Sequence, residues 1–126
     1  MPKIVVVEDE TTIWKLLEFK LKKAGYRMFH AASGEEALDL IRKYHPDLIL
    51  LDLMIPQPDG LQVLKILKED EELSGVPVII LSSLSQDDNI LEGLKLGAED
   101  YLTKPFSPEE LLIRVQKILK RSPKEA

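Results

Sequence analysis

Acidic, hydroxyl and ammonium side chains follow short apolar runs at several places in this sequence. They are Glu8, Asp9, Asp52, Ser82 and Lys104. Three carboxylates gathered at one place raise one another's pKa values unless a cation compensates for their charge. Oxygen ligands without histidine or cysteine suit Mg²⁺, which readily shares a site with phosphate oxygens. A lysine and a serine would then bind a phosphoryl group, and a carboxylate can accept one covalently. Each residue alone also fits a helix cap, a turn or a surface charge, so this chemistry requires that the side chains meet.

The elements that must bring these side chains together follow one repeating pattern. Short apolar or alternating segments begin at residues 4, 26, 48, 78 and 100, and the stretch after each one carries apolar residues at helical spacing. This pattern predicts a βα unit repeated five times, which is an α/β fold with a parallel sheet. The expected buried helix stripes include Leu16 after the first segment and Leu91 after the fourth.

The apolar content of the segments predicts their places in the sheet. Residues 4–7, 48–51 and 78–81 are apolar without interruption, which is typical of strands that are buried on both faces. The segment 26–31 alternates and carries Arg27 and His30, which favours an edge strand. His30 lacks a metal-ligand partner at helical or turn spacing, so we expect a structural or surface role for it. In such sheets ligands bind beyond the carboxyl ends of the strands, where the polar residues lie.

Length and composition limit the possible functions. The 126 residues suffice for one domain, and 44% hydrophobic with 31% charged residues is a globular composition. A net charge of -5 argues against nucleic acid as the main partner. The absence of cysteine excludes disulfides and zinc-thiolate sites, and it permits a reducing compartment. No apolar run is long enough for a membrane span or a signal peptide, so we expect no membrane contact and a cytoplasmic location.

Four separately placed motifs together resemble the receiver domain of two-component response regulators. They are Glu8-Asp9, the stretch Leu50–Gly60 around Asp52, Ser82, and the stretch Gly97–Phe106 with Lys104. The resemblance implies a doubly wound, flavodoxin-like (βα)5 fold whose five-stranded parallel sheet has the order 2-1-3-4-5. It covers about residues 3 to 121, so we expect a single receiver domain over 1–121 and a polar tail over 122–126.

The resemblance also implies a role for each site residue. Asp52 would be the phosphoacceptor, and Lys104 would pair with the phosphoryl oxygens. A Mg²⁺ ion would be held by Glu8, Asp9, Asp52 and the backbone carbonyl of Met54. The family pattern further implies a cis peptide bond between Lys104 and Pro105. Glu8 stands where the family commonly has aspartate, which lengthens one arm of the metal site.

A second group of residues would transmit and time the signal. Ser82 would be the switch hydroxyl, where threonine is commoner, and Tyr101 the switch aromatic residue. Met54 and Leu84 would flank the phosphoryl group, and because both are apolar we expect slow self-dephosphorylation. The expected phosphoryl donor is a sensor histidine kinase or a phosphotransfer protein.

Phosphorylation would switch the surface of the fourth helix, fifth strand and fifth helix to control a partner or an output domain. A mixed-charge patch on this surface would serve a phosphorylation-dependent homodimer. Its expected residues are Glu99, Asp100, Arg114, Lys117 and Arg121. Isologous contacts require opposite charges on one patch, which this set provides. The stretch Tyr101–Leu111 is also similar to receivers of winged-helix transcription factors, although we expect no direct nucleic-acid binding by this domain.

Two other classes of function remain open at this stage. An enzyme or redox protein on the same fold is one, but a haloacid-dehalogenase type of phosphatase would need a second aspartate where Met54 stands. A flavin carrier would need a phosphate loop at Glu8-Asp9, where the carboxylates would repel phosphate. A receiver-like module that binds partners without phosphorylation is the other, yet such modules usually lose acidic or lysine positions that are present here.

Overall fold

A computed structural model of the chain describes residues 1–83 and 87–120, apart from the side chains of residues 87 and 88. Strands and helices alternate along the chain. The strands are β1 (Lys3–Val7), β2 (Arg27–Ala31), β3 (Leu48–Asp52), β4 (Val78–Ser83) and β5 (Asp100–Lys104). The helices are α1 (Thr11–Lys23), α2 (Gly34–Tyr44), α3 (Gly60–Glu69), α4 (Asp87–Leu96) and α5 (Pro108–Lys120). The predicted βα repeat is therefore confirmed.

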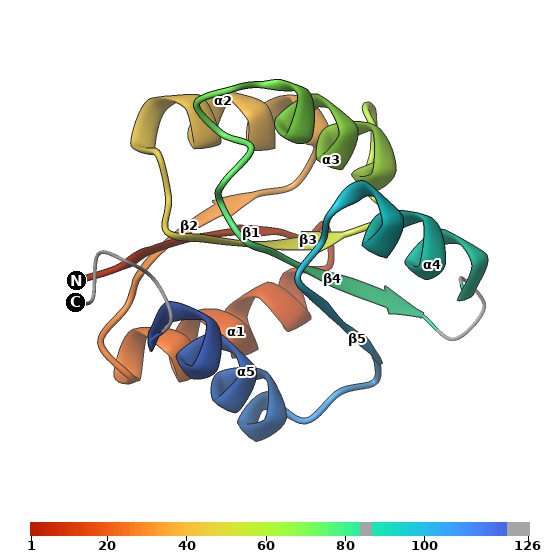
Figure 1. The fold of residues 1–126 in the computed structure, drawn as a ribbon. Coiled ribbons are helices and arrows are strands. Elements are labelled where there is room, and N and C mark those ends of the chain that lie inside the picture. Colours follow the sequence, from red (N-terminus) through yellow and green to blue (C-terminus); the bar gives the residue numbers. More distant parts are fainter. Residues whose placement is uncertain (84–86, 121–126) are drawn as a thin grey trace.

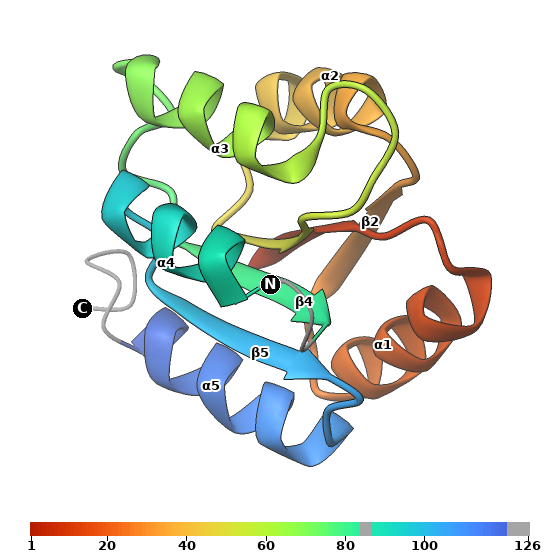
Figure 2. The same ribbon diagram turned by 90° about the vertical axis from the view of Figure 1, so that its right-hand side faces the viewer.

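One parallel sheet forms the middle layer, with the strand order β2-β1-β3-β4-β5 (Figure 1). The apolar strands β1, β3 and β4 occupy its centre, and β2 lies at an edge, as predicted. Helices α2, α3 and α4 cover one face, and α1 and α5 cover the other (Figures 1 and 2). Because the strands are parallel, their carboxyl ends lie at one rim of the sheet.

The core has two layers because side chains alternate between the faces of each strand. In β1, Val5 and Val7 pack toward α2 and α3, while Ile4 and Val6 pack toward α1 and α5. All four side chains are fully buried. Burying a branched aliphatic side chain contributes about 1.5–3 kcal/mol, so these central strands form a stable support for the rim.

Helix ends follow the local chemistry of the chain. The Ser33 side chain accepts a hydrogen bond from the Glu36 N–H and so caps α2. Asp59 and Gln62 form a reciprocal capping box at the start of α3. Such caps satisfy N–H groups that have no partner within the helix. The second cap fixes where α3 begins, eight positions after the Asp52 strand end.

Two leucines of the predicted helix stripes are exposed. Leu16 on α1 is 46% exposed and Leu91 on α4 is 55% exposed. Each lies next to a buried residue of its stripe, Leu17 and Ile90 respectively. Adjacent helical residues point about 100° apart, and in these two helices the neighbouring residue faces the sheet while the leucine faces solvent. The assignment of Leu16 and Leu91 to the buried stripes was therefore wrong.

Candidate functional site

The functional side chains gather at the carboxyl rim of the sheet. β1 leads directly into Glu8 and Asp9, β3 ends at Asp52, and β5 ends at Lys104. In the sheet register Val7 is opposite Leu51, and Asp52 is opposite Leu81. The adjacent strand ends therefore place residues that are far apart in sequence beside one another.

Lys104 is the centre of an ion-pair network. Its Nζ lies 2.8 Å from Asp52 Oδ2 and 2.8 Å from Glu8 Oε1. Glu10 Oε1 is farther away, at 3.8 Å from the same nitrogen. Burial by itself lowers the pKa of Lys104, but its close contacts with the Asp52 and Glu8 carboxylates outweigh that effect and raise the pKa. Lys104 thus remains a cation at the rim.

Asp52 is nearly buried and well oriented. Its residue is 3% exposed, and its Oδ1 accepts a hydrogen bond from the Met54 backbone N–H at 2.8 Å. Its other carboxylate oxygen accepts a hydrogen bond from Lys104. These two donors hold the carboxylate in one orientation at the end of a central strand, which is what a nucleophile in a group transfer requires.

Glu8 is fully buried, and its environment disfavours its charge. Burial is the largest cause that raises the pKa of Glu8 to about 7; Lys104 opposes this shift, and the neighbouring Asp52 adds to it. Glu8 Oε2 accepts a hydrogen bond from the Glu10 backbone N–H at 3.2 Å. Glu8 Oε1 lies close to Lys104 Nζ but without the alignment of a hydrogen bond, and within the described residues this oxygen has no hydrogen-bond partner.

The three acids are arranged so that they could hold a divalent cation. One carboxylate oxygen from each of Glu8, Asp9 and Asp52 lies within 4.8 Å of the others, and Asp9 is exposed to solvent. Glu8 Oε1 has the Lys104 ammonium beside it, but Asp52 shares that ammonium, so a divalent cation would further stabilise this buried oxygen. All-oxygen donors with one solvent-facing member suit Mg²⁺, which retains several waters.

The predicted switch residues lie on the two strands beyond Asp52. Ser82 is fully buried on β4, and its hydroxyl donates a hydrogen bond to the Ser83 carbonyl at 3.2 Å. Tyr101 on β5 is 41% exposed. The Lys104–Pro105 peptide bond is cis, as the family pattern implied, and so is the Gln57–Pro58 bond. Leu84 lies outside the described residues, and Met54 is exposed beside Asp52.

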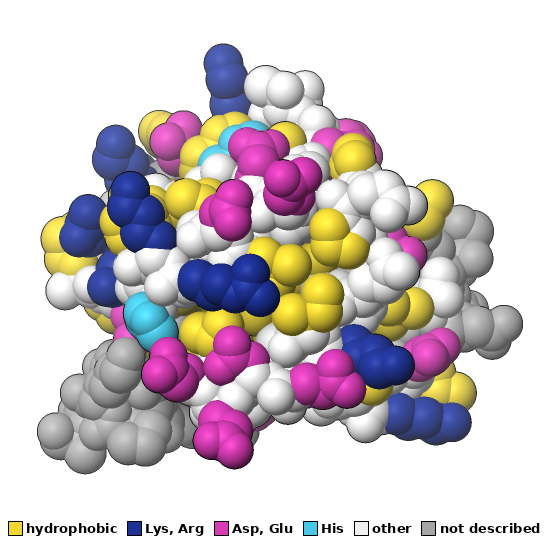
Figure 3. All heavy atoms as spheres, turned by 90° about the horizontal axis from the view of Figure 1, so that it is seen from above, with side chains coloured by type: hydrophobic (Ala, Val, Ile, Leu, Met, Phe, Trp, Pro, Cys, Tyr) yellow, Lys and Arg dark blue, Asp and Glu magenta, His cyan; other side chains and the backbone are white. Residues whose placement is uncertain are grey.

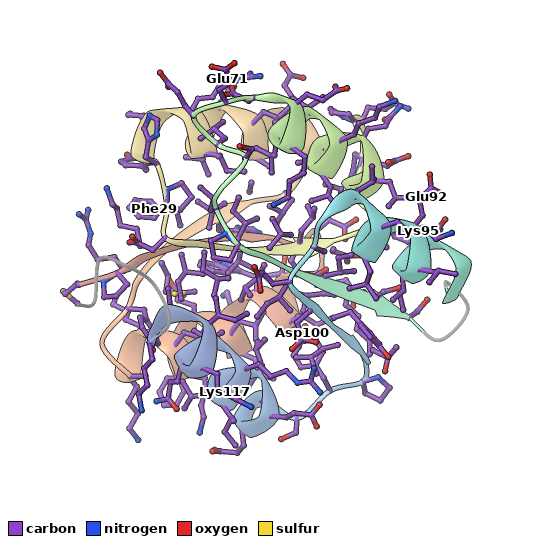
Figure 4. The ribbon with its side chains drawn as sticks, in the orientation of Figure 1. Phe29, Glu71, Glu92, Lys95, Asp100 and Lys117 are labelled. Atoms are coloured by element: carbon purple, nitrogen blue, oxygen red, sulfur yellow. The ribbon has the colours of Figure 1, made fainter. Side chains whose placement is uncertain are left out.

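Four of the predicted interface residues line one surface hollow between β5 and α5. These are Glu99, Asp100, Arg114 and Lys117. Asp100 belongs to β5 and Lys117 to α5 (Figure 4). Arg114 Nη1 donates to Asp100 Oδ1 at 2.7 Å within the same chain. The remaining residue, Arg121, and the predicted tail over 122–126 lie outside the described residues.

Sequence analysis missed two residues that shape the site. His30 Nε2 lies 2.7 Å from the Glu8 carbonyl oxygen. Gly60 packs so closely that a Cβ atom there would lie 2.7 Å from the Asp52 carbonyl oxygen and 2.4 Å from the Leu53 Cα atom. The position of Gly60 directly after the Asp59 cap could have indicated a close backbone contact. The contact of His30 could not be predicted, because it depends on the register between β1 and β2.

This architecture and this acid-lysine rim are those of a receiver, and the chain belongs to the response regulator receiver domain family. The model of that family, described as "Response regulator receiver domain", matches residues 4–116. The protein is thus a signalling domain of two-component systems.

Individual relatives agree with this family. The chain is 45% identical over 119 residues to "Probable transcriptional regulator ycf27" of Porphyridium aerugineum, covering 94% of this chain and 48% of that protein. The Francisella response regulator 1452 receiver domain is 44% identical, with a TM-score of 0.88 and coverage of 96% and 98% of the two chains. The BeF3-activated receiver domain of Klebsiella pneumoniae RstA is 34% identical, with a TM-score of 0.85 and coverage of 94% and 99%.

The chain spans about half the length of the curated relatives it matches. No helix in the described ranges combines the length and the apolar character that crossing a membrane requires.

Proposed function

We propose that the chain is a phosphorylation-controlled switch whose acceptor is Asp52. The observation that carries this proposal is the buried Asp52 carboxylate, which is hydrogen-bonded to Lys104 and adjacent to two further acids. A purely structural ion pair would need one acid for one lysine, whereas this rim gathers more negative than positive charge. A divalent cation would offset that excess negative charge, and it would also offset the charge of an added phosphoryl group.

Each side chain of the site would have its own role in phosphoryl transfer. An Asp52 carboxylate oxygen attacks the phosphorus of a phosphohistidine, the phosphorus–nitrogen bond breaks, and the leaving imidazole takes up a proton. The Lys104 ammonium then moves its hydrogen bond from the carboxylate to a phosphoryl oxygen. Glu8, Asp9, Asp52 and the Met54 carbonyl would hold Mg²⁺, which when bound neutralises charge on the phosphoryl oxygens.

The transmitted change would pass from β4 to β5. The buried Ser82 hydroxyl would turn from the Ser83 carbonyl to a phosphoryl oxygen, and Tyr101 would move into the space that this change opens. Such a switch is a shift between two packings that both exist before phosphorylation. Met54 and Leu84 would shield the phosphorus from water, which makes the phosphorylated state long-lived.

Two kinds of partner fit this role. A sensor histidine kinase or a phosphotransfer protein would supply the phosphoryl group. The curated relatives named as transcriptional regulators are about twice as long as this chain, so we propose that the domain, residues 1–121 with a short tail, acts as the receiving half of a regulator of that kind. Acidic and basic side chains are interspersed on the α2–α3 face (Figure 3), which does not favour nucleic acid there.

Transfer from a small phosphoryl donor tests the proposal. Wild-type protein incubated with labelled acetyl phosphate should gain an acyl phosphate, which alkali and hydroxylamine cleave, in Mg²⁺ and almost none in excess EDTA. The Asp9→Asn variant should require more Mg²⁺, because it lacks one ligand. Equal labelling with and without Mg²⁺ would contradict the metal-assisted mechanism.

A further inference from the structure

We propose that His30 is a positioning residue that fixes the Glu8–Asp9 peptide and so aims both carboxylates at the cation. His30 Nε2 lies 2.7 Å from the carbonyl oxygen of Glu8. A carbonyl oxygen can only accept, so Nε2 must carry the proton and donate it. This inference rests on the proposed metal site and adds a residue outside the acid-lysine set.

The His30 ring replaces a missing backbone partner. β2 ends at Ala31, which is paired with Val7, and the Glu8 N–H donates to the Ala31 carbonyl at 3.0 Å. Beyond this point the strand ladder stops, and the Glu8 carbonyl would have to find another donor. The imidazole supplies that donor, so the hydrogen bonding of β2 to β1 continues one group past the end of the strand.

The orientation of this carbonyl controls the metal ligands on either side of it. The six atoms of a peptide unit lie in one plane, so fixing the Glu8 carbonyl also fixes the direction of the Asp9 N–H and Cα. Glu8 and Asp9 both belong to this peptide, and their carboxylates lie within 4.8 Å of each other and of Asp52. A rotated Glu8–Asp9 peptide would move the exposed Asp9 carboxylate away from the buried Glu8 carboxylate.

Trp14 holds the imidazole in place. The indole and imidazole rings stack with centroids 4.4 Å apart and an interplanar angle of 8°. Trp14 is itself anchored, because its backbone N–H donates to the Glu10 carbonyl at 3.0 Å. The segment Glu8–Glu10 is therefore held to the end of β2 by His30 and to the start of α1 by Trp14. Partners of this kind typically change metal affinity by about 10–100-fold when they are removed.

Three substitutions distinguish the effect of the His30 hydrogen bond from the effect of its aromatic ring. His30→Phe keeps an aromatic ring against Trp14 and removes the donor. His30→Gln places an amide N–H where Nε2 lies, whereas the shorter His30→Asn does not reach that position. We expect the Mg²⁺ dissociation constant, measured by titration calorimetry, to rise about tenfold in His30→Phe and His30→Asn and to recover in His30→Gln.

Controls distinguish this role from a general loss of folding and from failure of the metal site. Urea unfolding in EDTA reports the stability of each variant, and His45→Asn removes the other histidine. In a long-range ¹⁵N–¹H spectrum of the wild type, the His30 proton should reside on Nε2. Unchanged Mg²⁺ affinity in a folded His30→Phe variant, or a proton on Nδ1 alone, would overturn the positioning role only. A wild type that binds no Mg²⁺ would overturn the proposed metal site as well.

Discussion

The two buried acids at the rim differ in how their negative charges are stabilised. Asp52 accepts hydrogen bonds from the Met54 N–H and from Lys104. Glu8 is fully buried, and one of its oxygens pairs with Lys104 but has no hydrogen bond from the part of the chain that the structure describes. Lys104 therefore neutralises two carboxylates at once. The charged form of Glu8 is the less stabilised of the two, and the pKa of Glu8 rises to about 7. The Glu8 carboxylate is therefore held in an environment that disfavours its negative charge, and a bound divalent cation would relieve this cost.

Removing this charge should stabilise the metal-free fold. Between the ordinary pKa of 4.5 and the raised value of about 7, folded Glu8 keeps a proton that the unfolded chain releases. Its contribution to stability therefore falls as pH rises through this window. We expect Glu8→Gln to raise the free energy of unfolding at pH 8 by about 1–3 kcal/mol, and to have little effect near pH 4.

Urea unfolding in EDTA from pH 4 to pH 8 measures this difference. Glu71→Gln, at an exposed acid on the surface (Figure 4), is the matched control and should leave the pH dependence unchanged. Parallel stability curves for wild type and Glu8→Gln across the whole range would show that Glu8 carries no such penalty.

Sequence reasoning predicted which charged residues meet but not every group that holds them. The acids and Lys104 follow strand ends, and parallel strands bring their ends to one rim, so the gathering of Glu8, Asp9, Asp52 and Lys104 could be predicted. The residue His30 could not be assigned, because its contact with Glu8 depends on the register of β1 and β2. Its type and its half-buried edge position were also compatible with a structural role.

At the scale of elements, the connection from β3 to α3 depends on close backbone contact. A Cβ atom at Gly60 would lie 2.4 Å from the Leu53 Cα atom and 2.7 Å from the Asp52 carbonyl oxygen. The Gly60 N–H also donates to the Leu53 carbonyl at 3.1 Å. The start of α3 therefore presses directly on the strand end that carries the acceptor.

Gly60→Ala should damage both stability and phosphorylation. The contacts are with backbone atoms, which cannot move aside as a flexible side chain can, so we expect a loss of about 1–3 kcal/mol in the free energy of unfolding. Displacement of the Asp52 backbone should also slow labelling by acetyl phosphate. Gly75→Ala is the control, because a Cβ there meets nothing within 4 Å. Equal stability of the Gly60 and Gly75 variants would refute this account of the connection.

Element boundaries and buried faces were the less predictable part of the fold. Periodicity predicted five helices, but a stripe of adjacent leucines cannot show which one faces the sheet. Leu16 and Leu91 were assigned to the core and are exposed, because neighbouring residues on those helices fill the inward positions. The Asp59–Gln62 capping box has a readable spacing but was not predicted from the sequence.

For the whole molecule, the layered fold separates the acidic rim from the β5–α5 surface. Asp9 and Met54 lie at the rim, whereas Arg114 and Lys117 lie along α5. In this structure Arg114 pairs with Asp100 and Glu110 of its own chain. A homodimer through this surface would therefore have to exchange internal ion pairs for intermolecular ones, and exposed pairs contribute only about 0–1 kcal/mol each.

We accordingly predict a weak dimer that depends on phosphorylation and on salt. Sedimentation should show self-association of the beryllofluoride-loaded protein at low ionic strength, and less of it at about 0.5 M salt, where screening is strong. Lys117→Glu should reduce this association, and Glu71→Gln, on another face, should not. A loaded protein that stays monomeric at high concentration would exclude this surface as a dimer interface.

The central claim is that Asp52 is the phosphoryl acceptor, and intact-mass measurement tests it most directly. Wild type and Asp52→Asn are incubated with acetyl phosphate and Mg²⁺, and their intact masses are measured before the acyl phosphate hydrolyses. Asparagine keeps the size of the side chain and removes the nucleophilic oxygen. The account predicts one added phosphoryl group on the wild type and none on Asp52→Asn. A wild type that gains none, or an Asp52→Asn variant that gains one at the wild-type rate, would contradict it.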